Sequence, residues 1–174
     1  SIAARVSSSV LPALTAASTC VATRSIVSAS RSRYAVSVIT PYFVRPSQDE
    51  LVAHFCRIAE SVALPVLGYN NPDRTGVSLT PETAARIAHA CPNFKGIKDS
   101  SGDLSNTMRY IALCPPDFAT FMGRDTLIYA GLTYGCAGAV AATANVVPEL
   151  VVGIYNAYQA GDLALGLERP RQLA

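Results

Sequence analysis

The sequence predicts an α/β fold built on a parallel β-sheet. From Tyr34 onward, short apolar and β-branched segments alternate five times with segments of helical character, which is the pattern of consecutive βαβ units. Half of the 174 residues are hydrophobic and only 15% are charged, as expected for a chain with a large buried core. Because βαβ crossovers are right-handed, the sheet is either doubly wound or closed into a barrel.

The elements are bounded by recognisable start and stop signals. A strand over Tyr34–Ile39 ends before Thr40-Pro41, and Ser47 with Glu50 forms a capping box that starts a helix running to about Ala63. Further strands are expected at 65–69, 94–98, 118–122 and 137–142, and further helices at 81–91, 104–113, 126–134 and 148–160. Turn-forming residues fill the loop 70–76, and Asp99–Asp103 (DSSGD) precedes the helix at 104 as an ordinary cap.

Residues 1–33 differ from the rest and receive no element. This segment is rich in Ser, Ala and Arg, and the first acidic residue of the chain is Asp49. Such a segment resembles an organelle transit peptide, but a frame error or damaged domain segment, or a real arm, explains it equally well. We therefore divide the chain into an unassigned segment, 1–33, and one α/β domain, 34–174.

Composition and spacing exclude several function classes. The net charge of +2 is too small to indicate a nucleic-acid partner, and no apolar run reaches the ~18 residues of a membrane span. Five scattered cysteines without CxxC spacing predict neither disulfides nor zinc, but thiols in a reducing cytoplasm. His54 and His89 lack a second ligand at helical spacing, so no metal is expected.

Candidate catalytic residues follow two neighbouring strands. Active residues of parallel barrels lie at the carboxyl ends of the strands, and Tyr69 and Lys98 end strands that are one βα unit apart, with backbones ~5 Å from each other. A desolvated lysine can form an imine with a ketone, and a tyrosine can move protons in that reaction. Lys95 begins the same strand and is expected to lie away from this end.

A second candidate feature is the loop after Tyr69. Arg74 in this loop could hold a substrate carboxylate with two parallel hydrogen bonds, although from the residue alone a solvated loop arginine is the more common interpretation. The absence of G-x-G-x-x-G and of a P-loop motif disfavours a doubly wound nucleotide- or phosphate-binding protein, which remains a weaker alternative.

Four motifs together resemble one enzyme family. ITPYF (39–43), YNNPDRTG (69–76), GIKDSSGD (96–103) and GAVAATANVVPE (138–149) occur at successive strand ends. In this order they resemble the dihydrodipicolinate synthase / N-acetylneuraminate lyase family of class I aldolases, over about residues 34–165. The resemblance implies an incomplete (β/α)₈ TIM barrel in which roughly strands four to eight are present.

The resemblance also implies roles for individual residues. Lys98 corresponds to the Schiff-base lysine, and Tyr69 to the tyrosine that shuttles protons and contacts the 2-oxo acid. Arg74 resembles the arginine that binds the carboxylate of the aldehyde substrate. Val140 lies where the family offers a backbone carbonyl to pyruvate, and Thr40 is expected at the lip of the same pocket.

The resemblance predicts a lyase that needs no cofactor and no metal. Its substrates would be a 2-oxo acid and an aldehyde, its location the cytoplasm, and its assembly a homo-oligomer, a dimer or tetramer. The most similar activity is that of 4-hydroxy-tetrahydrodipicolinate synthase, with another 2-oxo acid aldolase or dehydratase as an alternative.

Three departures from the family pattern favour a different interpretation. A complete barrel needs ~250 residues, the family's early Gly-Thr-Thr-Gly-Glu motif is not found, and Phe43 stands where the synthases usually have a second tyrosine. The short length and the missing motif favour a truncated, catalytically silent remnant, whereas Phe43 favours another 2-oxo acid lyase or dehydratase of the same family. Five strands alone would also leave two open sheet edges, and so predict aggregation or dependence on a partner.

Overall fold

The computed structural model describes residues 3–5, 20–22 and 34–173. Its strands are β1 (Ala3–Arg5), β2 (Cys20–Ala22), β3 (Tyr34–Ile39), β4 (Val66–Asn70), β5 (Phe94–Asp99), β6 (Ala119–Met122) and β7 (Gly138–Val140). Its helices are α2 (Gln48–Ser61), α3 (Pro72–Thr75), α4 (Pro81–Ala90), α5 (Leu104–Leu113), α6 (Ile128–Thr133), α7 (Pro148–Ala160) and α8 (Leu163–Arg171). Two 3₁₀ turns, η1 (Asp125–Leu127) and η2 (Thr143–Asn145), follow β6 and β7.

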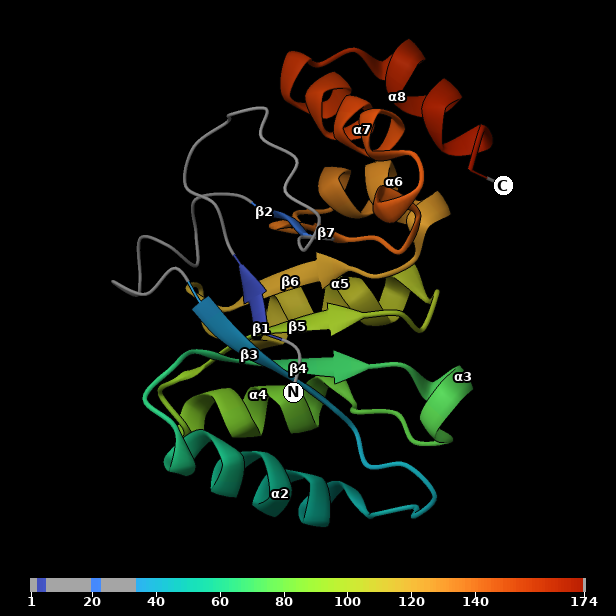
Figure 1. Cartoon of the computed structure of the whole chain (residues 1–174). Helices are drawn as coiled ribbons and strands as arrows, with labels where there is room; N and C mark the ends of the chain where they lie inside the picture. The colour runs from blue at the N-terminus through green and yellow to red at the C-terminus, as the bar shows by residue number, and fades with distance from the viewer. Residues whose placement is uncertain (1–2, 6–19, 23–33, 174) are drawn as a thin grey trace.

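Five parallel strands in chain order form the centre of the sheet. The strand order is β1-β3-β4-β5-β6-β7-β2, and β3 to β7 pair in parallel, each with the next strand along the chain (Figure 1). Since each of these strands is followed by a helix, the arrangement is that of consecutive units of a (β/α)₈ barrel. The expected fold class, an incomplete TIM barrel, is confirmed.

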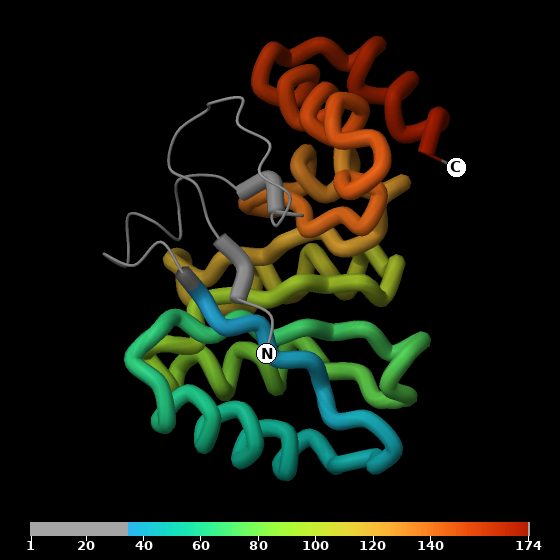
Figure 2. Tube along the Cα trace, viewed as in Figure 1, coloured from blue at the N-terminus to red at the C-terminus, as the bar shows by residue number. Residues whose placement is uncertain are grey.

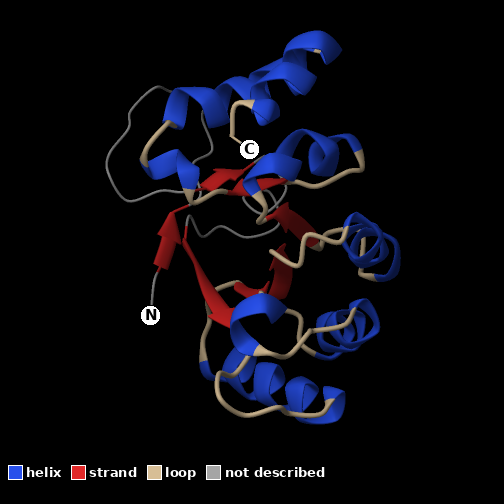
Figure 3. Cartoon of the chain, turned by 90° about the vertical axis from the view of Figure 1, so that its right-hand side faces the viewer, coloured by secondary structure: helices blue, strands red, loops and turns tan. Residues whose placement is uncertain are grey.

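The long helices cover one face of this sheet. Phe55 of α2, Ile87 of α4 and Tyr110 of α5 pack into one core with side chains of β4 and β5, and α6 and α7 form a second core with β6 and β7. A smaller cluster of Ala35, Leu67, Ala119 and Phe121 lies between strands on the other face. A doubly wound sheet would carry helices on both faces, whereas here they form an outer layer around a curved sheet (Figure 3).

Local signals placed most helix starts correctly. The Ser47 hydroxyl accepts a hydrogen bond from the Glu50 backbone, and the Glu50 carboxylate accepts one from the Ser47 backbone, as the capping box predicts. Thr80 caps α4, which has Pro81 at its first position, and Asp103 caps α5. The short α3 and the terminal α8 were not expected, because four residues show no period and because Pro170 lies inside α8. In Figure 2, α8 and α2 lie at opposite ends of the fold.

Two short strands flank the five parallel strands, and among the described residues the sheet still ends in two edge strands, β1 and β2, as predicted. β1 pairs antiparallel with β3, and β2 pairs antiparallel with β7. Both added strands come from the segment to which no element was assigned, because three residues are too few for an alternating pattern to be visible. The rest of that segment, and with it the question of a transit peptide, lies outside the described residues.

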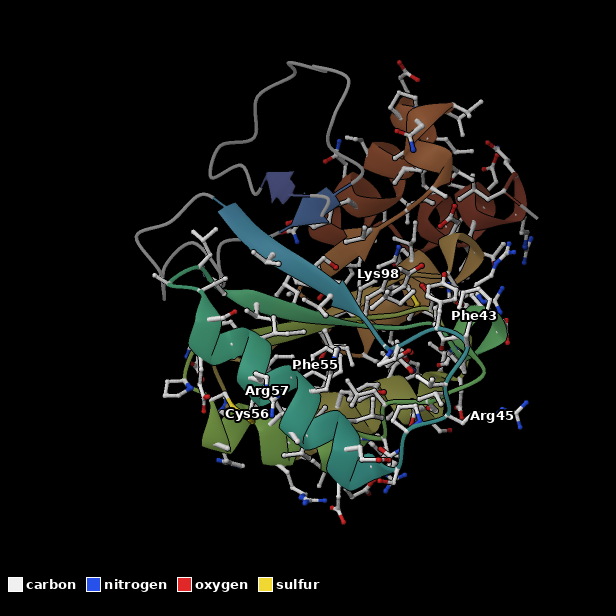
Figure 4. The ribbon with its side chains drawn as sticks, turned by 60° about the horizontal axis from the view of Figure 1, so that its bottom comes forward. Phe43, Arg45, Phe55, Cys56, Arg57 and Lys98 are labelled. Carbon is white, nitrogen blue, oxygen red and sulfur yellow. A yellow bond between two sulfur atoms is a disulfide. The ribbon has the colours of Figure 1, made fainter. Side chains whose placement is uncertain are left out.

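The prediction of free thiols was wrong for two cysteines. Cys56 on α2 and Cys91 at the end of α4 form a disulfide, with Cα atoms 5.9 Å apart (Figure 4). The pairing has no sequence signal, since the two helices become neighbours only when they pack side by side on the sheet. Cys114 and Cys136 are buried free thiols. No helix among the described residues is long and apolar enough to span a membrane.

Candidate active site

A cavity of about 570 Å³ lies at the carboxyl ends of the parallel strands. Residues that follow β4, β5, β6 and β7 line it, together with one residue near the C-terminus. These are Tyr69, Asn71, Asp73, Arg74, Lys98, Ser100, Gly123, Arg124, Asp125, Thr126, Ala142, Thr143 and Leu173. The cavity therefore lies where the active sites of parallel barrels are found.

Tyr69 and Lys98 meet in this cavity. They are direct partners in the parallel ladder of β4 and β5, so both side chains project from the same face of the sheet. Lys98 Nζ lies 4.2 Å from the centroid of the Tyr69 ring, and Figure 4 shows Lys98 within the side chains near the strand ends. The sequence-based expectation that these two residues approach each other is confirmed.

The surroundings of Tyr69 favour its ionised form. Burial by itself raises the pKa of the Tyr69 phenol, but the charge of Lys98 and hydrogen bonds at the phenol oxygen outweigh burial and hold the pKa below its ordinary value. One of these bonds is donated by Asn71 Nδ2 over 2.9 Å. A phenol of lowered pKa exchanges protons more readily near neutral pH than an ordinary tyrosine.

A buried carboxylate holds the loop after Lys98. Asp99 is 1% exposed, and its Oδ1 accepts hydrogen bonds from Asn70 Nδ2 and the Ser101 amide, while its Oδ2 accepts from the hydroxyls of Ser101 and Thr107. Asn70 Oδ1 in turn accepts from the Leu79 amide. These bonds connect β4, β5 and α5, and they fix the backbone from which Lys98 projects.

Gly123 makes room for the lysine. A β-carbon at this position would lie 2.1 Å from Ser100 Oγ, 2.9 Å from the Asp99 carbonyl oxygen and 3.0 Å from Lys98 Cε. Such distances are too short for any side chain, so only glycine lets β6 end against the Lys98 side chain.

Charged residues surround the outer part of the cavity. Arg74 lies on α3, beside Asp73, whose carboxylate accepts a hydrogen bond from Arg124 Nη2. Asp125 Oδ2 accepts from the Thr143 amide over 2.9 Å and thereby ties η1 to η2. Among the described residues no group of three or more His, Cys, Asp or Glu side chains is arranged to hold a metal.

Two of the five predicted site residues do not line the cavity. Thr40 is fully buried, and its hydroxyl donates to Thr75 Oγ1 over 2.9 Å, so it supports α3 from within the protein. Val140 is the last residue of β7 and pairs with Cys20 of β2. Its side chain packs against the cluster of Ala35, Leu67, Ala119 and Phe121. Their roles as substrate-binding residues remain predictions.

Comparison with known proteins assigns the chain to a family. A model of the dihydrodipicolinate synthetase family matches residues 15–173. The chain belongs to this family. It is 42% identical over 139 residues to 4-hydroxy-tetrahydrodipicolinate synthase of Methanopyrus kandleri, a match that covers 80% of this chain and 45% of that protein.

Solved structures of the dihydrodipicolinate synthetase family have the same fold. Dihydrodipicolinate synthase of Thermotoga maritima superposes with a TM-score of 0.76 at 36% identity, over 80% of this chain and 48% of that one. The prophage protein YagE of E. coli K12, solved in complex with pyruvate, gives a TM-score of 0.76 at 32% identity, over 80% and 48%. The chain thus spans about half the length of the relatives that it matches.

Several cavity residues of this family member were missed by sequence reasoning. Asn71, Ser100 and Arg124 were visible only as residues after strands, and the loop carrying Ser100 was interpreted as a helix cap. Their position directly after strand ends was the one signal that could have identified them. Phe43, where the family synthases usually have tyrosine, is fully exposed in the loop after β3 with a positive φ of 65° (Figure 4).

Proposed function

We propose that this chain is a Schiff-base-forming lyase or synthase that acts on pyruvate or a related 2-oxo acid. The observation that carries the proposal is the position of Lys98 Nζ, 4.2 Å from the centroid of the Tyr69 ring and beside a 570 Å³ cavity. An amine, a phenol of lowered pKa and space for a small molecule are the components that imine chemistry needs. Membership of the dihydrodipicolinate synthetase family, and pyruvate bound to YagE, support the same substrate class.

The reaction begins at Lys98. Its neutral amine attacks the ketone carbon of the 2-oxo acid, and loss of water leaves an imine between Lys98 and the substrate. The imine withdraws electrons, so that a proton leaves the neighbouring carbon and an enamine forms. Tyr69, held by Asn71, is placed to give and take protons in these steps.

Carbon–carbon bond formation follows from the enamine. Its nucleophilic carbon attacks the carbonyl of an aldehyde, the resulting alkoxide takes a proton, and the imine is restored. Water then adds to the imine and releases a 4-hydroxy-2-oxo acid and free Lys98. In this scheme Arg74, on α3 at the outer part of the cavity, binds the carboxylate of the aldehyde.

The second substrate decides between related activities. We propose a 4-hydroxy-tetrahydrodipicolinate synthase-like reaction first, because that is the activity named for the Methanopyrus relative. Phe43 favours a different 2-oxo acid aldolase or dehydratase, since it lacks the hydroxyl that the second tyrosine of the synthases carries. The proposal also includes a homo-oligomer, dimer or tetramer, located in the cytoplasm.

Borohydride trapping tests the imine directly. The folded chain is incubated with pyruvate, reduced, and mapped by peptide mass spectrometry, with the Thermotoga maritima enzyme as positive control. We expect a reduced adduct on Lys98 that is absent in Lys98→Ala and retained in Lys95→Ala. Lys95 is the matched control because it lies on the same strand but forms an ion pair with Asp117 and does not line the cavity.

The outcomes separate an enzyme from a silent family member. An adduct confined to Lys98 supports the proposal. Circular dichroism and size-exclusion chromatography establish that the sample is compact, and a compact sample without any adduct would overturn the proposal in favour of a catalytically silent chain.

A further inference from the structure

An ion pair at the cavity joins two residues from different elements. Arg124 follows β6 and Asp73 belongs to α3, and both line the cavity. Their side chains form a hydrogen-bonded salt bridge. The Arg124 guanidinium also lies over the DSSGD loop, since its Nε is 3.2 Å from the position that a β-carbon on Gly102 would take.

More cations than carboxylates line the cavity, and both carboxylates already accept hydrogen bonds from the protein. Three cations line it, Lys98, Arg74 and Arg124, against two carboxylates. Asp125 accepts from the Thr143 amide and Asp73 from Arg124. Within the part of the chain that the structure describes, both carboxylates are therefore engaged, and the cavity has an excess of positive charge.

The pair between Arg124 and Asp73 can be exchanged at low cost. Its side chains are 46% and 61% exposed, and ion pairs so open to water contribute little stability. A guanidinium has five N–H donors and binds a carboxylate best through two parallel hydrogen bonds. A substrate carboxylate entering the cavity can therefore replace Asp73 on Arg124 without loss of a strong interaction.

We propose that Arg124 is a specificity-determining residue that binds the acid group of the aldehyde substrate, and that Asp73 is its counter-ion in the empty site. The two arginines then act together, because Arg74 adjoins Asp73 in α3 and Asp73 contacts Arg124. The substrate class is an aldehyde with a carboxylate remote from its carbonyl group. This inference rests on the proposed function and assigns the residue that selects the second substrate.

Two variants of this ion pair distinguish a role in substrate binding from a role in holding α3 in place. If Arg124 binds the substrate, Arg124→Gln removes a ligand and Asp73→Asn removes a competitor. With pyruvate and 4-oxobutanoate, we expect Arg124→Gln to raise the KM for the aldehyde at least about tenfold, and Asp73→Asn to leave it unchanged or lower it. With butanal, which has no acid group, neither variant should alter the KM.

Arg109→Gln is the matched control. Arg109 forms an ion pair of similar exposure with Glu82 on α4, away from the cavity residues. We expect this variant to behave as the parent with both aldehydes. Equal losses in Arg124→Gln and Asp73→Asn, with acidic and neutral aldehydes alike, would overturn the proposal and show that the ion pair only holds α3 in place.

Two further measurements separate this inference from the proposed function. Trapping of pyruvate on Lys98 needs no aldehyde, so it should be as efficient in Arg124→Gln as in the parent. Calorimetric binding of succinate needs no chemistry, and it should weaken in Arg124→Gln and not in Asp73→Asn. If succinate binds in an Arg124-dependent way but pyruvate is not trapped, the proposed function is contradicted and this inference is not. If pyruvate is trapped but succinate binding does not depend on Arg124, this inference is contradicted and the proposed function is not.

Discussion

Lys98 Nζ lies 4.2 Å from the centroid of the Tyr69 ring, and the two residues are partners in neighbouring parallel strands. The contact places a positive charge against a phenol that is partly buried. The charge of Lys98 therefore lowers the pKa of the Tyr69 phenol, and this effect can be measured without any substrate.

Replacing Lys98 should change the ionisation of Tyr69. Lys98→Met removes the charge that lowers the pKa of Tyr69, while the opposing effect of burial remains. We expect the pKa of Tyr69 to rise relative to the parent, as measured by ultraviolet difference titration against Tyr69→Phe in each background. Lys95→Met should leave this titration unchanged, and an identical titration in Lys98→Met would show that the two groups are not coupled.

Gly123 should tolerate no side chain. In Gly123→Ala the new β-carbon meets Ser100, the Asp99 carbonyl and Lys98 Cε, so the lysine must move. We expect pyruvate trapping to be lost or reduced by more than about tenfold, together with a destabilisation of about 1–3 kcal/mol from overpacking.

Gly161→Ala provides the control for this substitution. Gly161 has a φ of 69° at the end of α7, and a β-carbon there meets nothing within 4 Å. It should cost about 1 kcal/mol from backbone conformation and leave trapping intact. Normal trapping in Gly123→Ala would contradict the role given to Gly123.

Asp99→Ala should be among the more destabilising substitutions. It leaves Asn70 Nδ2 without its buried acceptor and leaves the Thr107 hydroxyl only the Asp103 carbonyl. We expect a loss of about 3 kcal/mol or more in the free energy of unfolding, measured by urea denaturation. Asp103→Ala, which removes only the N-cap of α5, should cost about 1 kcal/mol. Similar losses in the two variants would mean that the Asp99 network contributes little.

The disulfide between Cys56 and Cys91 should stabilise the folded chain. Cys56 and Cys91 are separated by 35 residues in sequence, and closing a loop of this length stabilises the folded state by ~4 kcal/mol. We expect reduction, or the double variant Cys56→Ser/Cys91→Ser, to lower the free energy of unfolding by this amount.

Alkylation of the folded chain checks the same assignment. Burial raises the pKa of the Cys114 and Cys136 thiols to about 12, so neither should react with iodoacetamide at neutral pH. Peptide mapping should find Cys56 and Cys91 labelled only after reduction. Labelling of both without a reductant would show that the disulfide is not formed.

The order of strands and helices followed from local signals. The capping box at Ser47, the Pro81 helix start and the β-branched segments are contacts between residues close in sequence, so they can be recognised before the chain folds. The same signals put Tyr69 and Lys98 at strand ends. The resemblance to an enzyme family then rested on motifs at those ends.

Residues of the cavity were harder to predict where they depend on distant partners. Arg124 is held at the cavity by its ion pair with Asp73, which lies on α3, an element too short to be expected. Thr40 is buried, and its hydroxyl donates a hydrogen bond to Thr75. The disulfide between Cys56 and Cys91 likewise required two helices to become neighbours.

The sequence by itself determined the α/β class, the family and the position of Lys98 and Tyr69 at neighbouring strand ends, because period, caps and motifs are properties of short segments. Only the tertiary structure decided which strands flank the five parallel strands, which cysteines pair and which charges surround the cavity. These features join residues that are far apart in sequence, and their pairing depends on the packing of whole elements, which no local pattern records.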